Sequence, residues 1–158
     1  MKQCLVLLLT LCILLSCAAC GAGEEAPPTF YYLRTDDTTR YGQADALVAP
    51  VTRELSWDVP LSEMLQLYLQ GPGEDDYRSP VPMGTRLLRL TQDKDVLVLE
   101  LSGEFSALDG IQLSLAGACL TATCHTLAGY EAIEVRSGAN IYEFHLNDFV
   151  FLDTAAGE

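Results

Sequence analysis

The side chains best suited to chemistry are two cysteines and two histidines in the second half of the chain: Cys119, Cys124, His125 and His145. A cysteine nucleophile needs a base within reach, and His125 cannot serve the adjacent Cys124 because neighbouring side chains diverge on a helix. The four residues also lack the close spacing of zinc ligands. The two cysteines lie five residues apart in an expected helix, so they point about 140° apart. We expect them to be buried thiols without a disulfide.

Acidic pairs and short motifs are the other candidates for chemistry. Asp36-Asp37 and Asp75-Asp76 fit no EF-hand calcium loop, and we expect both pairs to lie in solvated turns. The sequence contains no glycine-rich phosphate loop and no Gly-x-Ser-x-Gly elbow. We therefore expect no catalytic residues, no metal and no cofactor, and a protein that is not an enzyme.

The composition indicates one acidic globular domain. Of the 158 residues, 49% are hydrophobic and 20% are charged, which excludes disorder over most of the chain. Acidic residues number 22 against 9 basic residues, for a net charge of −13. This charge repels phosphate backbones and anionic lipids, so we expect no nucleic-acid partner. Any attachment to a membrane must use an apolar or covalent anchor.

Residues 1–16 have the order of a lipoprotein signal peptide. Lys2 is the only charge in this segment, and the apolar run of residues 5–15 is too short to span a bilayer. The Leu-Leu-Ser-Cys-Ala-Ala-Cys-Gly stretch that follows resembles a bacterial lipobox, in which the cysteine receives a diacylglyceryl group. We favour Cys17 as the lipid anchor, with Cys20 as the alternative. Either anchor places the protein at the extracytoplasmic face of the cell membrane.

The rest of the chain divides into three parts. Residues 17–28 are rich in small residues, acids and prolines, and we expect a flexible tether there. Residues 29–152 have the apolar content of a single domain, and residues 153–158 form a short tail.

Within the domain, β-rich runs alternate with two helical segments. The expected helices are 58–70 and 110–127, the second apolar on nearly all sides and therefore mostly buried. The intervening ranges 35–46 and 74–78 are expected loops. The expected strands are 29–34, 47–55, 85–91, 96–101, 132–136 and 141–146, with a short extended piece at 148–152. This order predicts an α/β (α+β) sandwich with one mixed, mostly antiparallel sheet packed by two helices.

Several single residues set the expected boundaries. Asp58 is the expected N-terminal cap of the first helix, and Pro60 suits its first turn. Gly71 can adopt the left-handed conformation that ends a helix, and Pro72 prevents continuation. Pro50 restricts its strand to the edge of a sheet.

Four short motifs occur in order along this domain. They are a Val-Thr-Arg strand, a Gly-Pro helix stop, a Ser-Pro-x-Pro-x-Gly-Thr element and a strand ending in Leu-Ser-x-x-Phe. With these motifs the chain resembles the GerMN domain of sporulation and spore-germination proteins of the GerM type and of related lipoproteins. The matching residues are Val51, Thr52, Arg53, Gly71, Pro72, Ser79, Pro80, Pro82, Gly84, Thr85, Leu101, Ser102 and Phe105.

The resemblance covers about residues 47–146 and implies a fold like that of ring-building domains. It also implies a non-enzymatic interaction or assembly module, acting in envelope complexes of sporulation or germination. The partner would then be a protein at the outer face of the cytoplasmic membrane. GerM itself carries two such domains, whereas this chain has room for one.

The motif residues are expected to have structural roles. Gly71 and Gly84 sit where the backbone needs unusual dihedrals, and Phe105 belongs to the core. The role of Arg53 is open: it could pair with a neighbouring carboxylate or face a partner. The candidate carboxylates are Glu54, Glu63 and Glu100.

Two other functions compete with the interaction module. A small-ligand-binding sensor lipoprotein would need a pocket lined by aromatic side chains. The candidates for that lining are Phe30, Tyr31, Tyr32, Tyr130, Tyr142 and Phe144. An envelope hydrolase would have to use His145 with Cys119 or Cys124.

Overall fold

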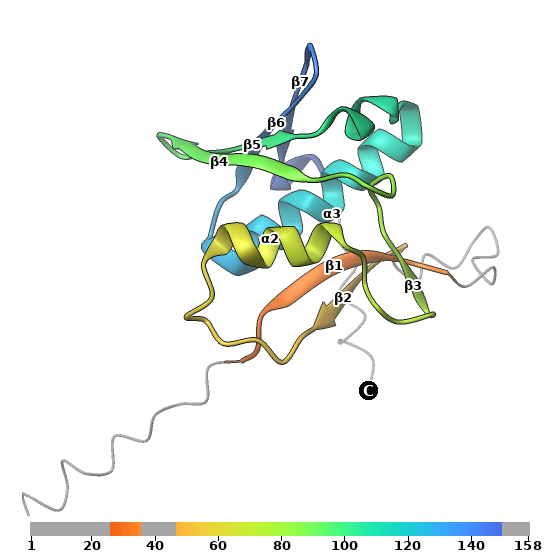
Figure 1. Ribbon diagram of the computed structural model, residues 1–158, viewed down its shortest axis with the longest axis vertical. Coiled ribbons are helices and arrows are strands. Elements are labelled where there is room, and N and C mark those ends of the chain that lie inside the picture. Colours follow the sequence, from red (N-terminus) through yellow and green to blue (C-terminus); the bar gives the residue numbers. More distant parts are fainter. Residues whose placement is uncertain (1–25, 36–46, 150–158) are drawn as a thin grey trace, which may run out of the picture.

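A computed structural model describes residues 26–35 and 47–149 (Figure 1). The expected signal peptide, both candidate anchors Cys17 and Cys20, the Asp36-Asp37 pair and the C-terminal tail lie outside the described residues.

Two β-sheets enclose two helices (Figure 1). One sheet has the strand order β2-β1-β3 and the other has the order β4-β5-β6-β7. The strands are β1 (Thr29–Arg34), β2 (Val48–Thr52), β3 (Tyr77–Arg78), β4 (Leu87–Asp93), β5 (Val96–Leu101), β6 (Ala132–Ser137) and β7 (Asn140–His145). The helices are α2 (Leu61–Leu69) and α3 (Gly110–Ala128), with 3₁₀ turns η2 (Gly103–Ala107) and η3 (Leu146–Asp148).

The α+β class predicted from the sequence is confirmed, but the expectation of one sheet is wrong. The physical reason is the second helix. Ten residues of α3, from Ala116 to Cys124 and at Leu127, are buried, and they lie all around the helix. One sheet can cover only one side of such a helix, so the chain places a sheet on each side.

The four-stranded sheet is built from four of the expected strands, which pair as two hairpins. β4 and β5 pair antiparallel, and the turn between them has a positive φ of 54° at Lys94. β6 and β7 form the second antiparallel hairpin. α3 joins β5 to β6 as a crossover, so these two central strands run parallel. Their side chains on the inner face, Leu97, Leu99, Ile133 and Val135, form much of the core.

α3 is long and apolar enough to cross a membrane, with a mean hydropathy of 1.2. Its packing shows instead that it is the central helix of the fold. At Gly117 the helix meets the Phe144 ring of β7 so closely that an added Cβ would lie 2.3 Å from a ring carbon. A residue of any larger size at this position would push the helix off the sheet.

α3 also completes the other sheet. β3 pairs with β1 only at Leu33 and Arg34, so the first half of β1 has no strand on that side. There the Tyr31 N–H donates to Thr123 Oγ1 at 2.9 Å, and Thr126 Oγ1 donates to the Thr29 carbonyl at 2.8 Å. The helix therefore closes a strand edge that would otherwise expose backbone polar groups to the core.

α2 is shorter than expected at its N-terminal end. It begins at Leu61 with Pro60 at the cap position, and no side chain caps it. The expected cap by Asp58 is wrong: this carboxylate accepts from Ser56 Oγ at 3.2 Å, because it lies two residues before the cap. The expected helix end is confirmed, since Gly71 has a φ of 101°.

Other boundaries differ by a few residues. β2 ends at Thr52, and its Pro50 lies on the edge strand as expected. The expected loop 74–78 contains the short strand β3. The end of the expected tether packs on the domain: Pro28 is buried, and the Ala26 carbonyl accepts from the Trp57 indole N–H at 2.9 Å.

Replacing Thr123 by valine should destabilise the fold by about 1–3 kcal/mol, because the Tyr31 N–H loses the oxygen that accepts its hydrogen bond. Urea unfolding of both proteins measures this change. Thr123→Ser keeps the hydroxyl and is the control. Equal stability of the valine variant and the native protein would contradict the edge-closing role of α3.

Candidate functional site

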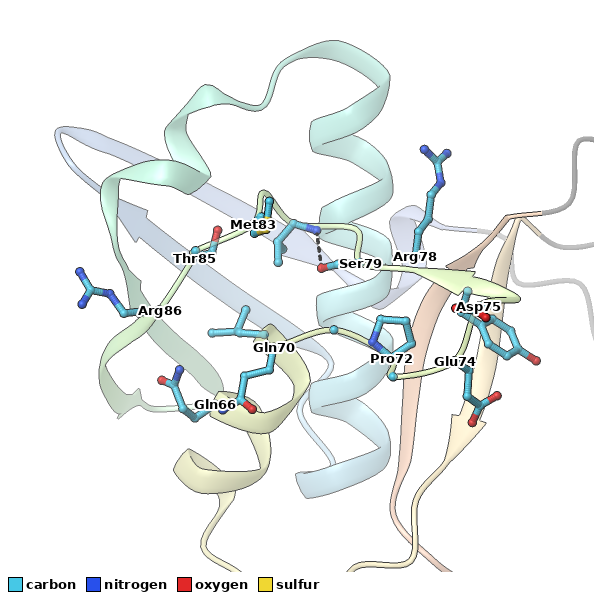
Figure 2. A pocket seen from close by; sticks show the side chains of 16 residues that line it. Gln66, Gln70, Pro72, Glu74, Asp75, Arg78, Ser79, Met83, Thr85 and Arg86 are labelled. Carbon is cyan, nitrogen blue, oxygen red and sulfur yellow. Dashed lines mark hydrogen bonds between the residues drawn. The ribbon is translucent and has the colours of Figure 1, made fainter.

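The GerMN-like motifs converge on one open groove of about 730 Å³ (Figure 2). It lies between the C-terminal end of α2, strand β3 and the segment that leads into β4. Five motif residues line it: Gly71, Pro72, Ser79, Gly84 and Thr85. The groove is therefore a product of the same residues that carry the family resemblance.

Arg53 fixes one wall of the groove. Its guanidinium donates to the Gly71 carbonyl and, at 3.4 Å, to the Tyr32 hydroxyl. It also lies over the rings of Phe30 and Tyr32, 5.6 and 5.9 Å from their centroids. The sequence left the role of Arg53 open between pairing with a carboxylate and facing a partner. In the fold its guanidinium binds a helix-terminal carbonyl, a class of acceptor that sequence pairing rules did not suggest.

The carboxylates considered for Arg53 lie elsewhere. Within the described residues the ion pairs are Arg89 with Glu100, at 3.6 Å, and Arg136 with Glu134. Glu54 and Glu63 are exposed and take part in neither pair.

Tyr32 strengthens the same wall. Its hydroxyl donates to the carbonyl of Tyr68 at 3.1 Å, with Gly71 O at 3.4 Å. Burial raises the pKa of Tyr32 to about 12, against the opposing effect of the Arg53 charge. The hydroxyl therefore stays protonated at neutral pH and keeps holding the end of α2.

Ser102 fixes the opposite wall. The Arg86 N–H donates to Ser102 Oγ, and the Ser102 N–H donates to the Arg86 carbonyl, both at 2.9 Å. Ser137 Oγ in turn donates to the Ser102 carbonyl at 2.8 Å, which ties this point to β6. The groove wall thus continues into the hydrogen bonding of the four-stranded sheet.

The segment between the walls holds its own shape. Thr85 Oγ1 donates to the Pro82 carbonyl at 2.7 Å, and Gly84 has a φ of 89°, as expected from the sequence. Ser79 Oγ accepts from the Val81 N–H at 3.3 Å (Figure 2). These local bonds make the segment a preformed turn.

The remaining motif residues support the groove from the core. Val51, Leu101 and Phe105 are buried, and the expectation for Phe105 is confirmed. The Phe105 ring meets Tyr142 edge-on at 5.7 Å. Pro80 is buried, while Thr52 is exposed on the edge strand β2.

The candidate nucleophiles lie away from the groove. Cys119 and Cys124 are free, as expected, and buried in α3, and burial raises the pKa of each thiol to about 12. His125 is half-buried and His145 is exposed on β7. Residues 26–35 and 47–149 contain no cluster of three or more His, Cys, Asp or Glu side chains that could hold a metal ion.

The aromatic side chains considered for a ligand pocket mostly build the core. Phe30 and Tyr32 are fully buried and stack on Tyr68, with centroids 6.2 and 4.9 Å apart. Neither the groove nor a smaller hollow of about 140 Å³ beside β6 and β7 is lined by any of the six candidates. The four other candidates, which also lie outside both linings, are Tyr31, Tyr130, Tyr142 and Phe144.

Among other lining residues, the two basic ones were missed from the sequence: Arg78 and Arg86, both exposed. Figure 2 shows them at opposite sides of the groove, with Glu74 and Asp75 at a third side. The signal that could have found them is charge spacing, since each arginine directly flanks the Ser79 to Thr85 motif.

These features define a small α+β domain with a motif-built surface groove. The model of the Germane family, described as "Sporulation and spore germination", matches residues 29–137, so the chain belongs to this family. The description names cellular processes and no enzymatic activity.

Two solved structures are similar in fold. The first GerMN domain of the sporulation protein GerM from Bacillus subtilis is 15% identical, with a TM-score of 0.47, over 61% of this chain and 76% of that one. A candidate lipoprotein from Clostridium perfringens is also 15% identical, with a TM-score of 0.44, over 76% of this chain and 88% of that one. A comparison with curated proteins finds no match.

Iodoacetamide should leave Cys119 and Cys124 unmodified in the folded protein at neutral pH, because buried thiols with a pKa of about 12 hold almost no thiolate. Mass spectrometry of the peptides that carry them measures this. Both residues should react once guanidinium chloride unfolds the chain. Rapid labelling of either cysteine in the native state would contradict the burial.

Arg53→Met should destabilise the domain by about 1–3 kcal/mol, because the Gly71 carbonyl and the two ring faces lose their cation. Hydrogen exchange should rise first around Gly71, at the end of α2. Arg136→Met is the matched control, since its pair with Glu134 is exposed and should change stability little. Equal effects of the two substitutions would contradict the assigned role.

Proposed function

We propose that this Germane-family chain is a lipid-anchored, extracytoplasmic interaction module that assembles envelope complexes of sporulation or germination and is not an enzyme. The observation that carries the proposal is the groove. All four motifs build or support it, and hydrogen bonds hold both of its walls. The reactive side chains Cys119 and Cys124 are buried apart from it.

A preformed groove without a histidine or cysteine among the described residues of its lining suits binding rather than turnover. Binding to a rigid surface loses little conformational entropy, so partner recognition gains affinity from the fixed walls. Catalysis by a hydroxyl would require a base paired with it. The only serine in this described lining, Ser79, instead accepts from the Val81 N–H, and the carboxylates of Glu74 and Asp75 are exposed at the rim.

The anchor is supported by the sequence. The order of Lys2, a short apolar run and Ser16-Cys17 fits a lipobox, and two acyl chains hold a protein firmly where one chain is marginal. Ala26, the first residue that the structure describes, contacts the domain through Trp57. A linker from Cys17 to Ala26 would span roughly 30 Å when fully extended. The groove would then act within a few nanometres of the membrane surface.

Cross-linking of the full-length chain in intact cells, followed by purification and mass spectrometry, tests this function. We expect one stoichiometric membrane-protein partner, in growing cells or, if the role is sporulation, in starved cells. Cys17→Ala should release the chain from the membrane fraction and abolish this cross-link. Cys20→Ala is the control and should change neither.

Two outcomes decide the parts of the proposal. Loss of anchoring in the Cys20 variant alone would move the anchor to Cys20. Full biological activity of an unlipidated chain that remains in the cytoplasm would contradict the membrane-tethered function.

A further inference from the structure

The groove is less acidic than the molecule as a whole, because Arg78 and Arg86 balance Glu74 and Asp75 in its lining. From Arg78 to Gln92 the chain has three arginines and no acidic residue, although the whole chain carries 22 acidic and 9 basic residues. Arg89 is paired with Glu100. Arg78 and Arg86 are exposed, and neither belongs to an ion pair within residues 26–35 and 47–149.

One carboxyl group outside the groove, that of Glu104, is affected only weakly by the charge of Arg86. Arg86 lowers the pKa of exposed Glu104, but the main cause of that lowered pKa is a hydrogen bond from Ser102. Arg86 is held by its backbone, through Ser102, while its side chain remains available at the rim. Two preplaced cations thus face solvent at opposite sides of one groove (Figure 2).

The space between the two arginines is mostly apolar. Leu69, Val81 and Pro72 contribute to its lining, and Met83 stands 96% exposed beside them. β3 also lines the groove and is the outermost strand of its sheet, so a further extended segment can lie beside it. An exposed methionine next to an apolar lining is adaptable contact area for a peptide.

We propose that the groove binds an extended, acidic segment of a partner protein, whose carboxylates meet Arg78 and Arg86 while alternate apolar side chains meet the groove lining. This proposal rests on the interaction function and names the chemistry of the partner. Extended segments present successive side chains to opposite sides, which fits cations at the rims and an apolar floor. Acidic residues over the rest of the chain repel such a segment from other faces.

The groove also limits where the carboxylates of the segment can lie. Glu74 and Asp75 form the rim near β3 and disfavour a carboxylate there. The acidic side chains of the partner therefore align with the two arginines and avoid this corner.

Fluorescence anisotropy with the purified full-length chain in detergent tests the proposal. The probe is a labelled six-residue peptide of alternating glutamate and valine, compared with peptides that carry glutamine or lysine in place of glutamate. We expect the glutamate peptide to bind roughly tenfold more tightly than the glutamine peptide at low salt. The difference should shrink at high salt, because exposed charges are screened.

Substitutions assign the binding to the two arginines. The double variant Arg78→Gln with Arg86→Gln should remove the preference for the glutamate peptide. The control variant Arg136→Gln, in β6 and outside the groove lining, should leave this preference unchanged. Arg78→Glu with Arg86→Glu should instead favour the lysine peptide. Unfolding midpoints equal to that of the native chain show that these exposed changes leave the fold intact.

Three results would overturn the proposal: equal binding of the glutamate and glutamine peptides, an unchanged preference in the double glutamine variant, or binding to anionic phospholipid vesicles but to no peptide. A cellular partner whose cross-link survives the double glutamine variant would also overturn it, while leaving the interaction function standing. If no cellular partner is found but the peptide still binds, the proposed function is contradicted. The preference of the groove for acidic segments would then still hold.

Discussion

The fold depends on the burial of the middle turns of one helix. α3 carries apolar and small side chains all around, so water must be excluded from every side of its middle turns. A sheet on each side achieves this, and the chain uses α3 both as the crossover between β5 and β6 and as the lateral neighbour of β1. The threonines of α3 make the second contact possible, because a purely apolar helix would leave the backbone groups of β1 without partners.

The groove inherits its rigidity from this arrangement. Tyr68 of α2 stacks on Phe30 and Tyr32 of β1, and β1 in turn lies against α3. The end of α2 is therefore fixed by aromatic packing before Arg53 binds the Gly71 carbonyl. On the other side, Ser102 links the start of β4 to Ser137 in β6. A wall from each sheet meets at one surface, so movement of either sheet would change the groove.

The sequence predicted what local chemistry determines. The strands on either side of Lys94 and Gly138, the buried helix α3 and the helix stop at Gly71 all follow from propensity, periodicity and backbone freedom, and the structure confirms them. It could not predict what depends on contacts distant in sequence. The number of sheets that cover α3 depends on how the whole chain packs around the helix. The partner of Arg53 is a carbonyl that reaches its position only when the end of α2 has folded. The two-residue strand β3 has too little pattern to be read from sequence, because it exists only by pairing with β1.

Shape and charge in the groove come from different residues. The motif residues supply shape: Ser79, Gly84 and Thr85 hold the turn, and Ser102 holds the backbone at Arg86. The positive charges come from Arg78 and Arg86, which directly flank that motif. Within the described part of the chain, neither arginine side chain forms an ion pair. Under the proposed binding function, substitution at these two positions would alter which partner is attracted without disturbing the hydrogen bonds that form the walls. Such a scaffold would separate the free energy of folding from the specificity of binding.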